Sequence, residues 1–465
     1  MNSSGSLELS RRKFIGACCA SVGVTGMLST VAQLRMIGAV ANAASAPLSA
    51  GGASGDYKAL VCLFLAGGND ANNMLIPTDK STYAAYASAR STLAIPQDGL
   101  LALAPHSSDG RSFGFHPSLG DLRGLFSDGH VALLANVGTL AAPTTKAQYL
   151  ARSVPLPLQL FSHNDQQVQW QSSLPDQMFA SGWGGRLADL TNAFNEKNDI
   201  SMSISLAGQN AFQVGRKVTQ YAVNPNGVVQ PATGGGALAT LRLHAQTDIL
   251  KGEDDNLFDA AFSGMTLNAI ADSARLAAIL KKGAPLTTEF PKGNLGNQLH
   301  MIARLIAVAP DLGLRRQIFF ARVGGWDLHN GQLPVHARLF TDLSQSIAAF
   351  YRATVEIGVA EKVTTFTASD FGRTFTSNGG GSDHGWGSHH LIVGGAVKGG
   401  QIYGRVPDLK VNGPEDTGRG RWIPTTSVDE YSATVARWFG VSQTDMPIVL
   451  PNVGRFENPD LGFMA

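Results

Sequence analysis

Three apolar runs, each ending in a turn that carries an aspartate, constrain the fold of this chain most. The runs are residues 57–66, 317–323 and 362–368, and the aspartates that follow them are Asp70, Asp327 and Asp370. Continuous apolar runs bounded by turn residues are typical of strands that are buried on both faces of a sheet. Because ligands of open α/β sheets bind beyond the carboxyl ends of strands, we expect these aspartates to mark a functional edge.

Helical patterns alternate with the apolar runs. Residues 119–126 and 334–358 have helical periodicity, and residues 130–138 and 391–396 read as two more buried strands. This alternation predicts an α/β fold with a mostly parallel central sheet that helices cover on both faces. The polar, turn-rich stretch that begins near residue 195 and the helical pattern up to about residue 290 indicate an insertion or cap. One domain over residues 57–465 is therefore expected.

The N-terminal 46 residues have the pattern of a Tat-type (twin-arginine) signal peptide. Arg11 and Arg12 precede a mildly apolar run, and small residues follow at 41–46. A membrane anchor is the alternative, but Arg35 and several glycines interrupt the run. The pattern predicts export to the periplasm or the medium by the Tat machinery, with residues 47–56 as a linker. We expect no stable membrane span in the mature protein.

The cysteine content and the net charge argue against two features, an intramolecular disulfide and a nucleic-acid partner. Cys18 and Cys19 lie in the predicted signal, so Cys62 alone stays in the mature chain and no intramolecular disulfide can form. Cys62 lies inside an apolar run, which favours a core residue. The net charge is +1 and no basic stripe is present, which argues against nucleic acid as a partner.

Two strand-end motifs offer metal ligands. Asp70 lies in GGNDANN, and Asp327 and His329 lie in GGWDLHNGQ. Residues two apart in an extended segment point to the same side, so a carboxylate and an imidazole can bind one ion. The alternatives are a turn cap for Asp70 and an Asp–His hydrogen bond within a turn for the second motif.

The stretch SDFGRTFTSNGGGSDHGWGSHH gathers charged and imidazole side chains in a chain with only 15% charged residues. Asp370, Asp383 and His384 are candidate metal ligands, and glycines around the last two permit a backbone close to a ligand. Arg373 could hold a tetrahedral anion bidentately, or form a buried ion pair with Asp370. His389 and His390 are weaker candidates from the same stretch.

A catalytic nucleophile is the functional group that the sequence indicates least clearly. Ser162 in FSHND is our candidate, with His163 as a base or ligand; a turn-capping serine is the alternative. The sequence has no G-x-G-x-x-G after a strand, no P-loop motif, no C-x-x-C-H and no G-x-S-x-G. Asp and His candidates without cysteine ligands favour one or two divalent ions: Zn, Mn, Mg or Ca.

Together, LFLAGGNDANNMLIP, FHPSLGDLRGLF, GWDLHNGQ and SDFGRT…SDHGWG resemble an exported bacterial family, domain of unknown function 1501. The resemblance covers nearly the whole mature chain. It implies the alkaline phosphatase-like and sulfatase-like superfamily, an α/β/α sandwich with metals at the strand ends. In that superfamily an early strand-end Asp and a late strand-end Asp-His hold one ion, and an Asp-x-x-x-His pair with a late His holds another.

Carried over by position, the resemblance implies that Asp70 is the early Asp, Asp327 the Asp of the pair and Asp370 the late Asp. This chain departs from the pattern in two places: Phe371 follows Asp370 where His is expected, and His329 is two residues from Asp327 rather than four. The leading hypothesis is an exported metal-dependent hydrolase of phosphate or sulfate esters. The alternative is a non-catalytic exported metal-binding or assembly protein on the same fold.

Overall fold

The computed structural model describes residues 56–104, 110–195, 200–227, 238–252 and 257–465. The predicted signal peptide (residues 1–46) and most of the predicted linker (47–56) lie outside these residues. Within them, no helix is both long enough and apolar enough to cross a membrane.

The centre of the molecule is a mostly parallel sheet. Its 9 strands include eight in the order β11-β5-β10-β9-β1-β8-β6-β7, with β12 also paired to β5. Only the pairings of β10 with β9 and with β5 are antiparallel. The strands of this sheet are β1 (Lys58–Leu65), β5 (Val131–Gly138), β6 (Ser203–Ser205), β7 (Tyr221–Ala222), β8 (Arg316–Val323), β9 (Val363–Ser369), β10 (Ser388–Gly394), β11 (Ile402–Tyr403) and β12 (Thr426–Ser427).

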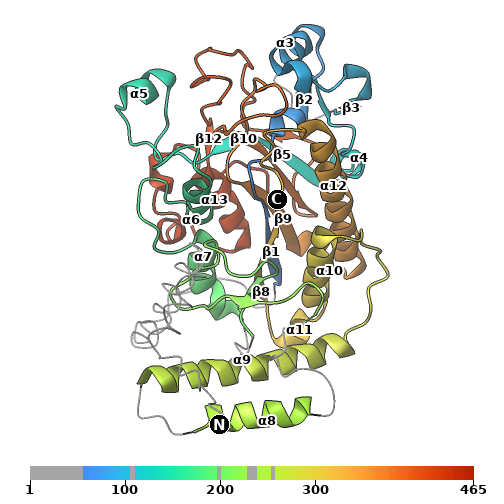
Figure 1. The fold of residues 1–465 in the computed structure, drawn as a ribbon, viewed down its shortest axis with the longest axis vertical. Coiled ribbons are helices and arrows are strands. Elements are labelled where there is room, and N and C mark those ends of the chain that lie inside the picture. The colour runs from blue at the N-terminus through green and yellow to red at the C-terminus, as the bar shows by residue number, and fades with distance from the viewer. Residues whose placement is uncertain (1–55, 105–109, 196–199, 228–237, 253–256) are drawn as a thin grey trace, which may run out of the picture.

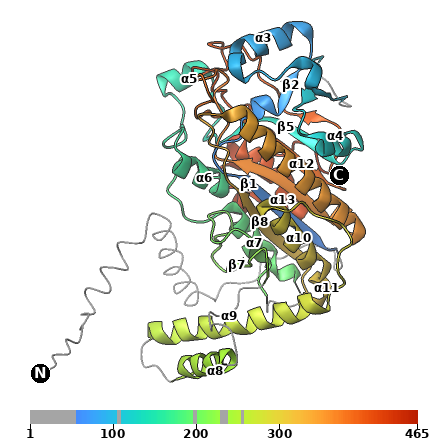
Figure 2. The same cartoon turned by 45° about the vertical axis from the view of Figure 1, so that its right-hand side comes forward.

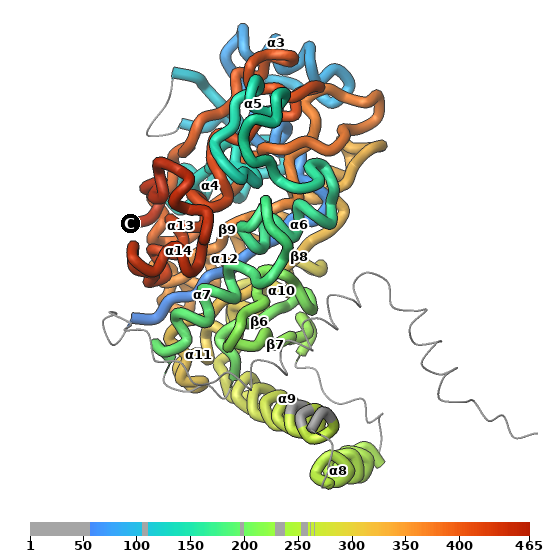
Figure 3. Tube along the Cα trace, turned by 90° about the vertical axis from the view of Figure 1, so that its left-hand side faces the viewer, coloured from blue at the N-terminus to red at the C-terminus, as the bar shows by residue number. Residues whose placement is uncertain are grey.

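Helices cover both faces of this sheet (Figure 1), which confirms the predicted α/β class. The helices used below are α3 (Lys80–Arg90), α4 (Gly120–Ser127), α5 (Lys146–Ala151), α6 (His163–Ser172), α7 (Trp183–Thr191), α8 (Ala239–Leu250), α9 (Leu257–Lys282), α10 (Asn294–Ala307), α12 (Gln332–Glu356) and α13 (Val428–Phe439). One face carries α4, α10 and α12. Viewed from the opposite side, α6 and α7 lie in front of the sheet (Figure 3).

Sequence patterns explain these elements. All but the first residue of β1 are buried, because both faces of the strand are covered by helices. The α13 helix begins at a capping box in which Ser427 and Glu430 exchange hydrogen bonds with each other's backbone N–H. A second, three-stranded antiparallel sheet, β2-β4-β3, is built from β2 (Leu75–Pro77), β3 (Leu101–Ala102) and β4 (Phe113–Phe115).

The region predicted to be an insertion has two parts. Strands β6 and β7 extend the main sheet beyond β8, whereas α8 and α9 lie at one end of the sheet (Figure 2), where Ser273 of α9 is 3.1 Å from the hydroxyl of Tyr221 in β7. Strands β6 and β7 therefore belong to the main sheet, whereas α8 and α9 cover neither of its faces. The boundaries of an insertion at 195–290 stay a prediction.

Candidate metal centre

The three acidic turns meet at one edge of the sheet. Strand β1 lies between β8 and β9 and is parallel to both, with Leu65 opposite Val323 and opposite Ser369. The turns that follow these residues therefore start at the same level. The three strand ends are therefore neighbours.

Asp327 lies among three imidazoles. Its Oδ1 atom is 2.9 Å from Nε2 of His329 and 3.4 Å from Nε2 of His384, and its Oδ2 atom is 3.3 Å from Nε2 of His163. The Nε2 atoms of His329 and His384 are 3.1 Å apart. Among the described residues, ligand atoms of His163, Asp327 and His384 lie within 4.8 Å of one another, which is a spacing that one metal ion can bridge.

A separate acceptor orients each of the three rings through its Nδ1 atom. Nδ1 of His163 lies 2.6 Å from Asp370, Nδ1 of His329 lies 2.9 Å from Asp383, and Nδ1 of His384 lies 2.8 Å from the Phe161 carbonyl. These acceptors require a proton on each Nδ1, and the Nε2 atoms face Asp327. This is the arrangement in which metal-binding histidines are held in proteins.

The Nε2 atom of His163 provides an independent test of whether a metal fits. This atom is buried, and it has no hydrogen-bond partner of suitable geometry in the described part of the chain. A buried nitrogen acceptor without a partner costs free energy, which a bound cation would remove. The donor set of imidazole and carboxylate suits Zn and other divalent transition ions. The residues present therefore fit a metal.

Asp370 orients His163 rather than facing the cluster with free oxygens. Its side chain is fully buried, and it accepts hydrogen bonds from the Gly67 N–H at 2.9 Å and from Gln167 at 2.7 Å besides His163. The hydrogen bond to Asp370 is the largest effect on His163, whose pKa is raised although burial opposes this. Asp383 has the same role toward His329. Asp370 and Asp383 were both predicted as metal ligands, but each contacts the Nδ1 atom of an imidazole on the side away from Asp327.

Arg373 faces Asp327 and not the solvent, which corrects its predicted role. Its guanidinium is about 1% exposed and donates to Asp327 at 2.6 Å and to the Gly67 and Ser382 carbonyls. Burial acts to raise the pKa of Asp327, but the hydrogen bond and charge of Arg373, together with the nearby imidazoles, outweigh it and the pKa is lowered. With its donors engaged inside the protein, Arg373 positions Asp327 and is not placed to hold a substrate anion.

Asp70 lies outside the cluster, and the prediction that it binds a metal does not fit its surroundings. Arg90 and Gln332 donate to its Oδ2 atom, and Asn72 donates to Oδ1 at 3.1 Å. Arg90 is fully buried at the end of α3, so Asp70 already has a cation beside it. Burial acts to raise the pKa of Asp70, yet the charges of Arg90 and His336 lower it.

Ser162 and His163 stand at the start of α6. The Ser162 hydroxyl donates to Asp165 at 2.5 Å and makes no capping hydrogen bond to the helix. Sequence reasoning placed His163 only as an alternative base or ligand, and the structure places it in the cluster. The signal for it was its position directly after the candidate serine in FSHND.

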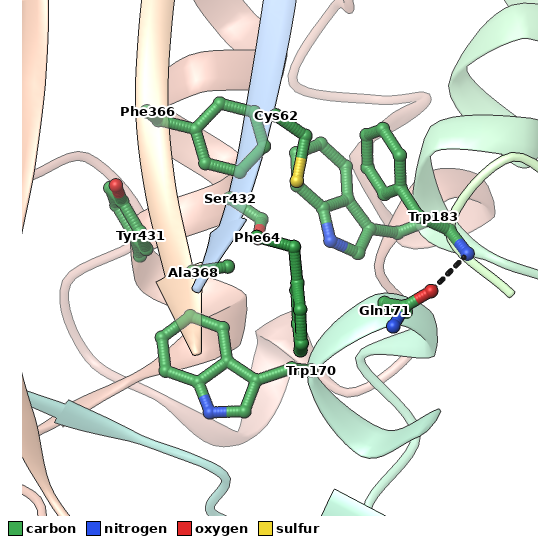
Figure 4. A pocket seen from close by; sticks show the side chains of 10 residues that line it. Cys62, Phe64, Trp170, Gln171, Trp183, Phe366, Ala368, Tyr431 and Ser432 are labelled. Carbon is green, nitrogen blue, oxygen red and sulfur yellow. Dashed lines mark hydrogen bonds between the residues drawn. The ribbon is translucent and has the colours of Figure 1, made fainter. Parts of the chain in front are cut away.

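Three other residues that the sequence analysis considered, His389, His390 and Cys62, lie in the core. Burial lowers the pKa of His389 to about 4 and that of His390 to about 3, so both are neutral. Cys62 borders an apolar cavity of about 10 Å³ between the sheet and α6 (Figure 4), too small for a substrate. Burial raises the pKa of this thiol, which confirms Cys62 as a core residue.

Solved structures with a similar arrangement include a sulfatase from Pseudoalteromonas sp., with 11% identity over 90% of this chain and 72% of that one, at a TM-score of 0.34. A phosphonate monoester hydrolase from Silicibacter pomeroyi has 9% identity over 85% of this chain and 77% of that one, at 0.33. The C-terminal periplasmic domain of EcEptC from Escherichia coli, in complex with Zn, has 11% identity over 91% and 96%, at 0.32.

The sequence matches no curated protein. Residues 57–418 match the family described as "Protein of unknown function (DUF1501)". The matched residues include Asp327, the three imidazoles and the acceptors that orient them. The chain therefore belongs to the DUF1501 family.

Proposed function

We propose that this protein is an exported metal-dependent hydrolase of phosphate or sulfate esters. One observation carries the proposal: the Nε2 atoms of His163, His329 and His384 face the Asp327 carboxylate, while each Nδ1 is held by an acceptor. A divalent ion bound by these groups would supply a Lewis acid that screens the negative charge of an ester. The twin-arginine pattern of residues 1–46 supports export.

The residues around the centre have separable tasks in this proposal. Asp370 and Asp383 keep two imidazoles in the tautomer that offers Nε2 to an ion. Arg373 fixes the Asp327 carboxylate. These contacts fix the ligand atoms before an ion arrives, which lowers the entropic cost of binding it.

Ser162 is the proposed nucleophile, with Asp165 as its base. The hydroxyl already donates to the Asp165 carboxylate, so the proton would pass to Asp165 as the serine oxygen attacks phosphorus or sulfur. A serine ester bond would form as the bond to the leaving oxygen breaks, and Asp165 would return the proton to that oxygen, so that the group leaves as an alcohol. Water would then hydrolyse the serine ester and release phosphate or sulfate.

Elemental analysis tests the metal centre first. Protein exported by its own signal should carry at least one equivalent of divalent metal, and His384→Ala should lose it. The control is His389→Ala, which removes a buried imidazole outside the cluster. Absence of metal from a folded wild-type protein would contradict the proposal.

The reaction is tested next with chromogenic phosphate and sulfate esters. Hydrolysis by the wild type that Ser162→Ala abolishes, with metal content unchanged, is the expected result. Retained hydrolysis in Ser162→Ala would remove this serine from the mechanism and leave the metal centre in place.

A non-catalytic metal-binding or assembly protein on the same fold is the second candidate. The specific observation in its favour is that the donors of Arg373 and the hydroxyl of Ser162 are both engaged by the protein. Metal in the wild type together with no hydrolysis of either ester class would favour it.

A further inference from the structure

Phe161, next to the metal centre, has a strained backbone. Its φ angle is +72°, in the left-handed region that a bulky aromatic residue rarely adopts. Such strain persists only where several contacts hold the residue, and it concentrates at functional sites. Three contacts hold Phe161: its N–H donates to Gln166 at 2.7 Å, its carbonyl accepts from His384, and its ring lies under a guanidinium.

That guanidinium belongs to Arg421. Its central carbon is 4.9 Å from the centre of the Phe161 ring, and its Nε atom donates to the His384 carbonyl at 2.8 Å. Arg421 therefore contacts both the residue that orients His384 and the backbone of His384 itself. Phe161, Arg421 and His384 therefore hold one another in place, so the His384 imidazole and the Arg421 guanidinium are positioned together.

The loop that carries Arg421 is held in place by Asp416. The buried Oδ1 atom of Asp416 accepts from the backbone N–H of Gly418 at 2.7 Å and of Arg421 at 2.9 Å. Asp416 and Trp422 also form a β-bridge. These contacts fix the backbone of Arg421, and the contact with the Phe161 ring fixes its guanidinium group.

Arg421 differs from Arg373 in what its donors contact. The donors of Arg373 are engaged by Asp327 and by buried protein oxygens. Arg421 is half-buried, and among the described residues only its Nε atom has a hydrogen-bond acceptor, so its two Nη groups are available. A guanidinium with two Nη donors beside a metal centre matches the paired oxygens of a tetrahedral anion.

We propose that Arg421, supported by Phe161, binds the anionic oxygens of the substrate's phosphate or sulfate group beside the metal centre. The inference rests on the proposed function of the same site. It assigns to Arg421 the role that the sequence pattern suggested for Arg373. The strained conformation of Phe161 then has a role, because the residue held in it places its ring under the guanidinium and its carbonyl at His384.

The test measures anion binding apart from turnover. Calorimetric titration of the metal-loaded protein with inorganic phosphate, and separately with inorganic sulfate, should give weaker binding in Arg421→Met by about tenfold or more. Arg421→Lys should recover only part of the loss, because an ammonium lacks the paired donors. The control is Arg437→Met, which removes an exposed arginine paired with Asp460.

Metal content, measured on the same samples, separates this inference from the proposed function. Unchanged metal with weakened anion binding in Arg421→Met supports the inference. Wild-type affinity for both anions in Arg421→Met overturns it, as does loss of metal together with anion, which would make Arg421 a positioning residue for His384. A metal-free wild type would overturn the proposed function instead.

Discussion

Two neighbouring strand ends of one sheet hold aspartates that differ in what balances their charge. After β1, the Asp70 side chain is 3% exposed and pairs with the fully buried Arg90. After β8, the Asp327 side chain is 42% exposed and faces three imidazoles as well as Arg373. We call the first the sealed strand end and the second the open strand end.

The comparison shows that position at a strand end does not by itself make a metal ligand. The sealed strand end has a permanent cation, and all the hydrogen bonds of its carboxylate are made within the protein. The open strand end has ring nitrogens whose lone pairs converge, one of them without a partner. We therefore expect changes at the sealed end to alter folding stability, and changes at the open end to alter metal binding.

Arg90→Met is expected to have the largest effect and tests the sealed strand end. It leaves the Asp70 carboxylate buried without its cation, so the free energy of unfolding should fall by about 3–5 kcal/mol in urea titrations. The Asp70→Asn, Arg90→Met double variant should lose clearly less, because no buried charge is left unpaired. Equal losses in the two proteins would show that packing, and not charge, explains the effect.

Asp383→Asn tests the open strand end by changing the residue that orients His329. Asp383 accepts from His329 and from Arg419, and its pKa is lowered because hydrogen bonds from Asn378, His329 and Arg419 outweigh the opposing effect of burial. Neutralising it should weaken metal affinity by about 10–100-fold, measured by competition with a chelator. The stability of the metal-free protein should change by about 1 kcal/mol or less, because the group is partly exposed.

The matched control for this experiment is Asp176→Asn. Asp176 also accepts from an arginine and an asparagine, Arg455 and Asn452, but lies outside the cluster. Metal affinity should be unchanged in this variant. A loss of affinity equal to that of Asp383→Asn would mean that the effect is not specific to the open strand end.

The sequence predicted the sheet well because its signals are local. The apolar runs that became β1, β8 and β9 are continuous, and the aspartates that follow them are adjacent in the chain. The direction of β10 was not predicted, since apolar content is the same for parallel and antiparallel strands. The alternation of strands and helices was enough for the fold class.

The partners of each aspartate could not be predicted from the sequence. Arg90 is 20 residues from Asp70, and it ends a helix with no sequence signal that links it to the strand end. Asp370 and His163 are 207 residues apart. Whether a carboxylate contacts an arginine or a histidine depends on such long-range contacts, which is why the sequence grouped Asp70 with Asp327 although its charged partner is Arg90.

Asp429 extends the comparison to a buried carboxyl group that has no salt bridge among the described residues. Burial raises its pKa to about 7, opposite in direction to the shift of the equally buried Asp70. Because its pKa in the folded state exceeds the unfolded value of about 3.9, its stabilising contribution is complete below that pH and is lost as the pH rises through 7. The paired carboxyl of Asp70 loses its contribution in the reverse direction, as the pH falls.

Asp429→Asn should therefore remove this pH dependence. Asp429 lies in the first turn of α13, whose N-terminal end favours negative charge and offsets part of the cost of ionisation. We expect the variant to exceed the wild type in unfolding free energy at pH 8 and to gain less at pH 4.5, in urea titrations at both values. A constant difference across this range would mean that Asp429 is ionised throughout. In that case Asp429 would be ionised without a salt bridge, as Asp70 is with one. The arginine beside Asp70 would then not be what keeps a buried carboxylate ionised.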